Sequence, residues 1–560
     1  MTDARKVAFK GRREMEVMRL SAIVSLSVAL ALPSARAAGH VRFSSLCGMA
    51  DVRADDYRVD CASKAGRFSF RTPAATPEWM SFAVNASVNG RKLPPFVLTD
   101  EASAGVKAPS HALFYTNAEA TAELEYKPGK AVFRLTLHRA KPLAVRDIVI
   151  GEGSRTDSSL LFDPSVRMTP YHEFPVTEPC AIKPGLASPP PWIFSYRREG
   201  RAGWWSVALE PEPDRIDFTT FEHVPLGDGR LAWTVRYPRV EPAAGDFAAP
   251  PLVFRFGDAD PFAALARHVA DLRAEGKMTV PDRKLPAWHS DTIACTWRYQ
   301  KELPRREQAN ERNCEAFVKM MEDHGVPFGT LIIDDFWGGK HGIWEADPKK
   351  WKDLRGFIDR QHEKGRHVLL WICTDGEGLP ADECVGSLWN PESPAFRVRL
   401  KEAARRMLSS EPDCYDADGV KFDFTSSAPG DCRRLKHVGC GFIRERFRVL
   451  SEALLAVKPE AILDYQCTNP YFTHTLTMLR LNDYFGATEH GLAEMRLRTK
   501  IARITAPGAL VDTDHISFRE YTYEGGYDFF RSCRELGVES LYLNEDDLKD
   551  PELLSILRGK

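Results

Sequence analysis

Acidic side chains and tryptophans recur in the second half of the chain, each at the end of a short apolar run. Asp334 and Asp335 follow the run 331–333, and Asp423 ends the run that contains Lys421. Carboxylates and cations hydrogen-bond to hydroxyl groups, and aromatic rings pack on the apolar face of a sugar ring. These residue types favour a sugar site, provided that the fold brings them together. The full candidate set is Trp297, Asp334, Asp335, Trp371, Lys421, Asp423, Arg480 and Asp483.

The apolar runs alternate with amphipathic stretches of helical period from about residue 281 onward. Residues 397–408 and 441–457 are examples of the expected helices. The expected strands are 291–297, 329–337, 366–374, 418–425, 461–467, 482–488, 509–515 and 539–545. Eight strands with intervening helices predict an α/β TIM barrel, (β/α)8, whose active site forms at the carboxyl ends of the strands. In this assignment the sixth strand follows Arg480 and opens with Asp483.

The first half of the chain has a different pattern, with short alternating segments separated by turn residues. Residues 121–140 form two alternating runs on either side of Pro128-Gly129, which is typical of a β-hairpin. Few helical periods interrupt this half, so it predicts an antiparallel β-sandwich. Trp204 and Trp205 are expected in its core or at a domain interface. We therefore expect a sandwich domain at residues 38–280 and a catalytic barrel at residues 281–560.

The N-terminal segment predicts export. The apolar run 20–32 follows a basic stretch and precedes Ala35-Arg36-Ala37, a small-x-small cleavage site. This run is too short to span a bilayer, which needs about 20 apolar residues, so residues 1–37 are expected to be a signal peptide. No later segment is apolar enough to cross a membrane. A periplasmic or extracellular location follows.

Composition excludes other partners. With 76 Lys+Arg against 78 Asp+Glu, the formal charge is −2, which argues against a nucleic-acid partner. The 12 cysteines contain no CxxC pair, so neither a structural zinc site nor a cofactor is expected. Cys47 with Cys61, or Cys432 with Cys440, are the nearest candidates for disulfides. The other cysteines that end apolar runs are expected to be buried free thiols, namely Cys295, Cys373 and Cys467. The oligomeric state is not predicted.

The strand ends resemble a known group of enzymes over roughly residues 290 to 490. Lys421-Phe422-Asp423 is similar to the nucleophile strand of the melibiase-type α-galactosidases and the related α-glucosidases and α-xylosidases. Asp334-Asp335-Phe336-Trp337 resembles the end of their second strand, and Arg480 followed by Asp483 resembles their sugar-binding arginine and acid/base. The stretch 342–372 also resembles the helix and strand that follow in these enzymes.

This resemblance implies a retaining α-glycosidase. Asp423 would attack the anomeric carbon, and Asp483 would protonate the leaving oxygen and later activate water, with the two carboxyl groups about 5–5.5 Å apart. Lys421 would keep Asp423 ionised, and Arg480 would bind vicinal hydroxyls or an acidic substituent. The resemblance also implies that Asp334 and Asp335 hold the hydroxyls far from the cleaved bond. Trp297 and Trp371 would form the walls of the pocket.

The chain departs from the pattern at two places, which leaves the sugar open. Phe424 follows the nucleophile where α-galactosidases tend to have Asn or Cys, and residues 468–471 replace a glycine-rich loop. α-Galactosidase is the leading activity, and an α-glucosidase, an α-xylosidase or an enzyme for a modified sugar is the alternative. A non-catalytic carbohydrate-binding barrel is a second class. A metal-dependent enzyme using Asp334, Asp335 and His341 is a third.

Three further acids have weaker signals. Asp431 and Asp464 are expected to be turn or helix-cap residues, as single strand-end aspartates usually are. Asp514, in Asp514-His515, fits a loop cap or a supporting pair as well as a ligand contact.

Overall fold

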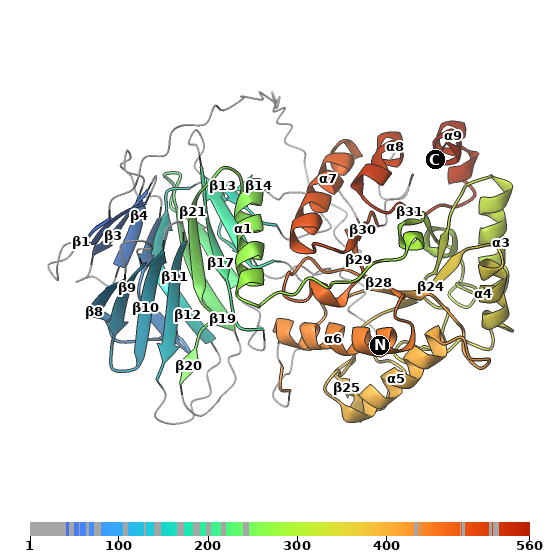
Figure 1. The fold of residues 1–560 in the computed structure, drawn as a ribbon, viewed down its shortest axis with the longest axis horizontal. Coiled ribbons are helices and arrows are strands. Elements are labelled where there is room, and N and C mark those ends of the chain that lie inside the picture. The colour runs from blue at the N-terminus through green and yellow to red at the C-terminus, as the bar shows by residue number, and fades with distance from the viewer. Residues whose placement is uncertain are drawn as a thin grey trace. The chain divides into compact units, whose positions relative to one another are not determined.

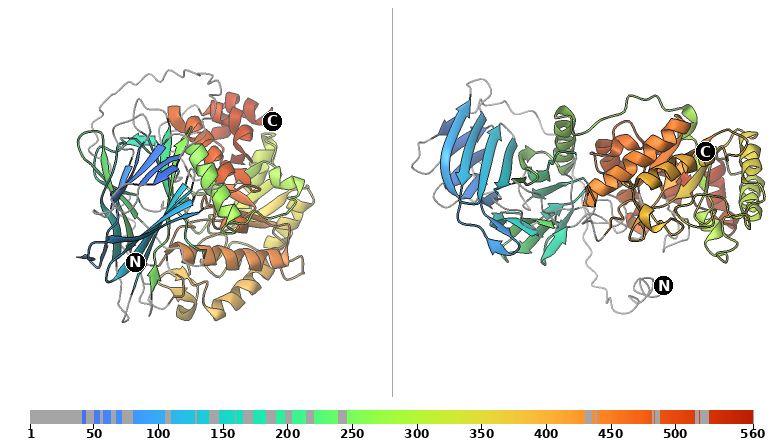
Figure 2. Two further views of the ribbon diagram at one scale, coloured as in Figure 1. Left: turned by 60° about the vertical axis from the view of Figure 1, so that its left-hand side comes forward. Right: turned by 90° about the horizontal axis from the view of Figure 1, so that it is seen from below.

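The computed structural model describes residues 41–43, 50–54, 57–62, 67–71, 80–104, 110–127, 130–138, 147–158, 160–164, 173–182, 191–197, 203–213, 220–238, 246–429, 435–437, 439–481, 483, 488–514, 518 and 526–559. The predicted signal peptide lies outside these residues, as do the Cys47, Cys61 and Cys432 side chains of the two candidate disulfides. Figure 1 shows antiparallel sheets in blue to green and a helix-surrounded barrel in green to red. Figure 2 shows the same elements from two other directions.

Two antiparallel sheets form the N-terminal half, which confirms the predicted sandwich class. The first sheet has the order β1 (Val41–Phe43), β2 (Ala50–Ala54), β3 (Tyr57–Ala62), β4 (Arg67–Arg71), β5 (Met80–Ala83), β12 (Asp147–Thr156), β19 (Leu231–Pro238), β18 (Thr220–Pro225) and β15 (Cys180–Ile182), with β6 (Ala86–Val88) beside β12 and β7 (Arg91–Lys92) beside β6. The second has the order β14 (Glu173–Pro175), β13 (Leu160–Phe162), β16 (Ile193–Arg197), β17 (Trp204–Leu209), β21 (Leu252–Asp258), β11 (Lys130–Leu137), β10 (Ala120–Lys127), β9 (Ser110–Thr116) and β8 (Val97–Ala104), with β20 (Phe247–Ala248) beside β11.

The hairpin expected at residues 121–140 is β10 and β11, which pair from Ala120↔Leu137 to Lys127↔Lys130. Their alternating side chains bury one face in an aromatic core. Trp204 and Trp205 are both buried there, and Trp205 stacks on Tyr196 with ring centroids 4.2 Å apart. The two tryptophans are therefore core residues, as expected.

Helix α1 (Pro261–Ala274) follows the last sandwich strand. Asp260 caps it by accepting hydrogen bonds from the Phe262 and Ala263 amides. The ammonium of Lys500 lies 3.6 Å from the centre of the Phe262 ring, and the Tyr471 hydroxyl donates to the Pro211 carbonyl at 2.9 Å. The residue 280/281 boundary remains a prediction within this continuous unit.

Within the described residues, eight parallel strands form the barrel. Their order is β30 (Leu510–Asp512), β29 (Met478–Arg480), β28 (Ile462–Tyr465), β27 (Gly419–Phe422), β24 (His367–Ile372), β23 (Thr330–Ile333), β22 (Ile293–Cys295) and β31 (Ser540–Leu541). A parallel bridge from Asp512 to Val538 closes the ring, because the Val538 amide donates to the Val511 carbonyl at 2.7 Å.

Helices lie outside the barrel strands (Figures 1 and 2). They are α3 (Glu311–Asp323), α4 (Leu354–His362), α5 (Pro394–Leu408), α6 (Gly439–Val457), α7 (Thr488–Thr505), α8 (Tyr527–Leu536) and α9 (Pro551–Arg558). The short helix α2 (Trp297–Gln300) follows β22. Short 3-10 helices are η2 (Ala287–Ser290), η3 (Ala381–Glu383), η4 (Thr473–Thr475) and η5 (Asp547–Lys549), and β25 (Cys384–Val385) pairs with β26 (Leu388–Trp389). Among the described residues, no helix combines the length and the apolar character that a membrane span requires.

The sixth strand was predicted wrongly. It is β29, Met478–Arg480, and not residues 482–488. A buried arginine interrupts the apolar pattern of β29, so the periodicity favoured the later run. The structure compensates this charge with two aspartates, which no local pattern reveals. Arg480 therefore ends the strand, and Asp483 follows it.

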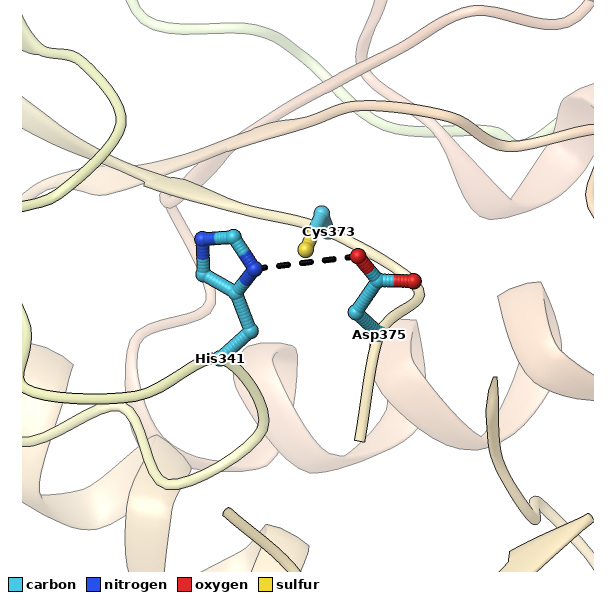
Figure 3. A group of neighbouring side chains, drawn as sticks. All are labelled: His341, Cys373 and Asp375. Carbon is cyan, nitrogen blue, oxygen red and sulfur yellow. Dashed lines mark ion pairs between the residues drawn. The ribbon is translucent and has the colours of Figure 1, made fainter. Parts of the chain in front are cut away.

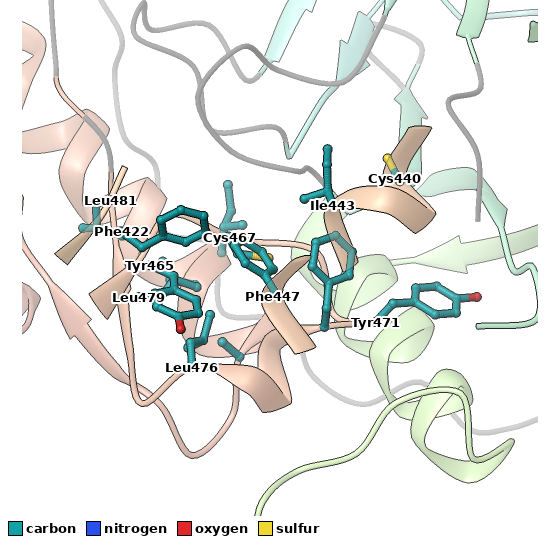
Figure 4. Packing of buried hydrophobic residues seen from close by; sticks show 14 of the residues in the cluster. Phe422, Cys440, Ile443, Phe447, Tyr465, Cys467, Tyr471, Leu476, Leu479 and Leu481 are labelled. Atoms are coloured by element: carbon teal, nitrogen blue, oxygen red, sulfur yellow. The ribbon is translucent and has the colours of Figure 1, made fainter. Parts of the chain in front are cut away.

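Packing outside β27 fixes which of its residues face inward. Phe422 points outward and contacts Tyr465 and Phe447 of α6, with ring centroids 5.2 and 5.7 Å apart respectively (Figure 4). Because successive strand residues face opposite sides, Lys421 and Asp423 are directed to the barrel interior. Gly419 begins β27 with φ +157, and a Cβ there would collide with the backbone of Ile462 in β28. Only glycine permits this close pairing.

Candidate active site

A buried ion pair forms the floor of the site. The Lys421 ammonium lies 2.6 Å from Asp334 Oδ2 and 3.0 Å from the Tyr542 hydroxyl oxygen. The Cys295 thiol also donates to Asp334 Oδ2, at 3.1 Å. Burial alone would raise the pKa of Asp334, but the charge and hydrogen bond of Lys421 hold it below its ordinary value. The pair is thus ionised, and its charged groups are hydrogen-bonded beneath the mouth of the barrel.

The direct ion-pair partner of Lys421 is Asp334, which the sequence did not indicate. Asp423 also acts electrostatically on Lys421, so the expected effect of Lys421 on the ionisation of Asp423 stays a prediction. Asp423 follows β27 and Asp334 follows β23, and spacing along one strand does not determine which carboxyl group lies closer to the ammonium.

Asp423 is held by three donors at the mouth. The Trp371 indole donates to Oδ2 at 3.1 Å, while Oδ1 accepts from Arg480 at 3.2 Å and from the Phe424 amide at 2.9 Å. The Asp423 side chain remains 20% exposed, whereas Arg480 is 2% exposed. These contacts orient an accessible carboxyl group, as a nucleophile requires.

Arg480 connects Asp423 to the seventh strand. Its Nε lies 3.4 Å from Oδ2 of Asp514, which is completely buried. Burial raises the pKa of Asp514 to about 6, against the attraction of Arg480 and with the added repulsion of Asp483. Asp514 is thus a supporting partner of Arg480, one of the three roles that the sequence left open. His515 lies outside the described residues.

Asp483 lies on the same rim, half-buried, in the segment after β29. Arg498 of α7 fixes the backbone there by donating to the carbonyls of Leu481 at 3.0 Å and Asp483 at 3.1 Å. Asp483 acts electrostatically on Asp514 and also on Lys301. It therefore shares the charged neighbourhood of Arg480.

The other predicted residues surround this centre. Asp335 Oδ1 accepts from the Phe336 amide at 2.7 Å and faces Nε2 of His341 at 2.8 Å. Burial raises the pKa of Asp335. The ring of His341 lies 5.4 Å from that of Trp371, which connects Asp335 to the Asp423 cluster. Trp297 is half-buried at the start of α2 and packs against the inner apolar cluster of the barrel.

The same strained turn follows Asp335 and Asp423. Phe336 has φ +73 and Phe424 has φ +54, and each donates its amide to Oδ1 of the preceding aspartate. A non-glycine residue in this region costs about 1–3 kcal/mol and is concentrated at functional sites. The repeated Asp-Phe at two strand ends was a sequence signal for this turn. Phe424 is also 53% exposed beside Asp423.

Sequence reasoning missed or misassigned several residues of the interior. Asp464 was expected to be a turn or cap, but it lies within β28 and is fully buried. Neither of its carboxyl oxygens has a hydrogen-bond partner among the described residues, and burial raises its pKa well above the ordinary value. It is therefore a buried acid of the barrel core whose uncharged form is favoured by burial. Asp431 lies outside the described residues. Cys295, Cys373 and Cys467 are buried free thiols, as expected.

A cationic cavity adjoins the site. It has a volume of about 320 Å³ and shares Phe336 and His341 with the surroundings of Asp335. Its basic lining residues are Arg305, Arg306, Lys340 and Lys350. The Arg305 guanidinium carbon lies 4.5 Å from the centre of the Phe336 ring. Its acidic lining residues are Asp347 and Glu377, so positive charge predominates.

The alternative of a metal site at Asp334, Asp335 and His341, whose clustering in the sequence did not suit zinc, finds no support in the described part of the structure. Among the described residues, no cluster of potential metal ligands contains Asp334 or Asp335. His341 instead groups with Cys373 and Asp375 (Figure 3).

Comparison with known proteins leads to the α-glycosidases. Residues 283–392 match the model of the glycosyl hydrolases family 31 TIM-barrel domain. The structure is similar to an α-N-acetylgalactosaminidase from Bifidobacterium bifidum in complex with GalNAc, with a TM-score of 0.61 and 11% identity over 91% of this chain and 93% of that one. An α-galactosidase from Lactobacillus brevis is similar with a TM-score of 0.52 and 11% identity, over 91% of this chain and 82% of that one. The galactosidase domain of an α-galactosidase–sucrose kinase is similar with a TM-score of 0.53 and 12% identity, over 85% of this chain and 73% of that one. No curated protein matches the sequence.

Residues 283–392 therefore resemble a glycoside-hydrolase barrel domain, and the chain shares with the solved structures the fold of a barrel preceded by antiparallel sheets.

Proposed function

We propose that this chain is an exported retaining α-glycosidase, similar to α-galactosidases, that removes terminal α-linked sugars. The observation that carries the proposal is the accessible carboxyl group of Asp423, oriented by Trp371, Arg480 and the Phe424 amide. Asp483 follows the strand that supplies Arg480, so a second carboxyl group is available on the same rim.

The mechanism follows from these positions. Asp423 attacks the anomeric carbon of a bound sugar while Asp483 protonates the leaving oxygen. The carboxyl group of Asp483 then takes a proton from water, which hydrolyses the glycosyl-enzyme ester. As the ester forms, Asp423 loses its negative charge, and Arg480 is kept in place by Asp514. Asp335 binds hydroxyls of the same sugar.

Hydrolysis of nitrophenyl α-glycosides tests the function. We expect release of nitrophenol from the α-galactoside or the α-N-acetylgalactosaminide. The α-glucoside and the α-xyloside test the alternative activities. The anomer first formed, measured by proton NMR, should retain the α configuration. Inversion would exclude double displacement, and hydrolysis of none of the four would exclude this substrate class.

Asp423→Asn separates an enzyme from a non-catalytic binding protein. The variant should lose at least about 10³-fold in kcat, because the covalent step disappears, but should still bind the sugar product. Asp423→Gly with azide should form a β-glycosyl azide. Unchanged turnover in Asp423→Asn would rule out this nucleophile. Sugar binding by the wild type without any turnover would instead support the binding protein.

The cationic cavity supports a second candidate within the same class, an α-glycosidase for a sugar with an acidic substituent. Lys340 is exposed, and its ammonium forms no hydrogen bond or ion pair with the described residues. Lys340→Ala should raise KM about tenfold for a sulfated or carboxylated substrate and leave the neutral substrate unchanged. Equal effects on both substrates would leave the neutral-sugar assignment in place.

Export is part of the proposal. The apolar run 20–32 and the cleavage site after Ala37 support it. Cell fractionation and N-terminal sequencing of the mature protein test it, with a mature chain that begins at residue 38 as the expected result.

A further inference from the structure

Three side chains from separate parts of the barrel converge beside the site. His341 lies in the segment after β23, while Cys373 and Asp375 follow β24. His341 Nδ1 is 3.7 Å from Asp375 Oδ2, and the nitrogen, sulfur and oxygen atoms of the three all lie within 4.8 Å of one another. Figure 3 shows the three side chains pointing toward a common centre. These separations are slightly larger than those between the ligand atoms of a bound metal ion, so small side-chain movements would complete the coordination.

The second ring nitrogen of His341 contacts Asp335 and so orients the imidazole ring. Nε2 faces Asp335 Oδ1 at 2.8 Å, on the opposite side of the ring from Cys373 and Asp375. A histidine that donates one N–H to a carboxylate presents the lone pair of the other nitrogen, and metal-binding histidines are held in this way. The Asp335 contact therefore orients the ring so that Nδ1 faces Cys373 and Asp375.

Cys373 and Asp375 are also fixed before any ligand binds. The Cys373 carbonyl accepts the Trp389 indole N–H at 2.9 Å, and Asp375 forms a bridge with Leu388 of β26. The Cys373 side chain is buried and lies close to His341 and Asp375, and the buried guanidinium of Arg446 interacts electrostatically with both Cys373 and Asp375. The Asp375 side chain is 49% exposed, so the cluster is open to water on one side.

We propose that His341, Cys373 and Asp375 bind a divalent transition-metal ion of the zinc class. One imidazole nitrogen, one thiolate and one carboxylate suit Zn²⁺ or Co²⁺ and do not suit Ca²⁺ or Mg²⁺, which prefer oxygen alone. Water on the exposed side supplies the fourth ligand. Binding forms metal–sulfur, metal–nitrogen and metal–oxygen bonds, and the protons of the Cys373 thiol and of His341 Nδ1 leave to solvent.

The ion would support Asp335. It fixes His341 through Nδ1, and His341 in turn holds the Asp335 carboxyl group through Nε2. This consequence, though not metal binding itself, rests on the proposed function, in which Asp335 binds sugar hydroxyls. Removal of the ion should therefore raise KM several-fold and change kcat little. His341, Cys373 and Asp375 are thus positioning residues.

Cobalt binding to the full-length mature protein provides the test. After chelator treatment, Co²⁺ should bind with a stoichiometry of about one and produce the near-ultraviolet charge-transfer band of a cobalt thiolate. Zn²⁺ should abolish the band and raise the Tm. Wild-type protein without the band or stoichiometric binding would overturn the proposal, and His341 would then be an imidazolium between Asp335 and Asp375.

Matched variants identify the ligands. Cys373→Ser should lose the band, whereas Cys467→Ser, which changes another buried thiol, should keep it. Asp375→Asn alters only a half-exposed side chain, so the protein should fold, and Co²⁺ affinity should fall at least about tenfold. A band that persists in Cys373→Ser, or undiminished affinity in Asp375→Asn, would contradict the assignment.

Failure of this inference can be distinguished from failure of the proposed function. Asp423→Asn should be inactive yet retain the cobalt band. Glycosidase activity in a protein that binds no cobalt overturns the metal site alone. A cobalt-binding protein that hydrolyses no α-glycoside overturns the function alone.

Discussion

Nη2 of Arg480 lies 3.2 Å from Oδ1 of Asp423, although 57 residues separate the two in the chain. Arg480 is completely buried, and its Nε lies 3.4 Å from Asp514 on the next strand. The charges of Asp514 and Asp423 raise its pKa well above the ordinary value despite burial. The guanidinium thus positions the carboxyl group of the predicted nucleophile, and Asp514 in turn positions the guanidinium.

Arg480→Lys is expected to impair catalysis more than binding. Lysine keeps the charge but cannot contact Asp423 and Asp514 with separate nitrogens in the planar arginine geometry. We expect kcat to fall about 100-fold, which corresponds to about 2.7 kcal/mol. Steady-state kinetics on the best nitrophenyl glycoside measure it. Arg305→Lys, at an exposed position, should stay within about twofold of wild type. Equal losses in both variants would contradict the special role of Arg480.

The indole N–H of Trp371 makes a separate, testable contribution. Trp371→Phe keeps an aromatic ring but removes the donor to Asp423 Oδ2. A hydrogen bond to a charged group is worth about 1.5–3 kcal/mol, so kcat/KM should fall roughly 10- to 100-fold. Trp344→Phe is the matched control, because the buried Trp344 indole N–H has no hydrogen-bond partner among the described residues. If Trp344→Phe lost as much activity, ring volume and not the hydrogen bond would explain the result.

The Lys421–Asp334 pair should contribute to stability as well as to the site. Lys421→Met leaves the buried Asp334 carboxylate without its cation and should cost about 3–5 kcal/mol of unfolding free energy. Lys421→Met with Asp334→Asn removes both charges and should recover part of this loss. Urea unfolding of the two single variants and the double variant gives the coupling energy. Strict additivity would show that the pair is not coupled.

Acid stability should depend on Asp418 at the start of β27. His362 Nε2 lies 2.8 Å from its carboxyl group, and the backbone amide of Val368 donates to it at 2.9 Å. Although burial opposes it, these partners and Lys458 hold the pKa of Asp418 well below the ordinary value, while Asp418 raises the pKa of His362.

The sign of the pH effect follows. The folded state binds fewer protons at Asp418 than the unfolded state, so its contribution is complete above about pH 4 and is lost as pH falls through the lowered pKa. The His362 contribution is complete below about pH 6.5 and is lost as pH rises through its raised pKa. Asp418→Asn should therefore destabilise most between about pH 4 and 6.5 and less in stronger acid. Urea unfolding across this range measures it, and a pH-independent difference would contradict the linkage.

The sequence alone determined the architecture and named the candidate residues. The change from alternating to βα patterns separated sandwich from barrel, because strand and helix periods are local properties. Seven of the eight expected strands coincide with observed ones, and the strand-end rule placed Asp335 and Asp423 correctly. The exception is instructive: β29 carries a buried arginine, and burial of a charge is acceptable only when distant residues compensate it.

Only the tertiary structure decided the partners. Lys421 forms its direct ion pair with Asp334, and His341 lies against Asp335, Cys373 and Asp375. Asp464 is a buried acid within a barrel strand, where a turn or cap was expected. The local sequence pattern indicates which way a side chain faces. Ion pairs, ligand clusters and pKa shifts depend on atoms from distant parts of the chain, which lie within a few ångströms of one another only after the barrel has closed.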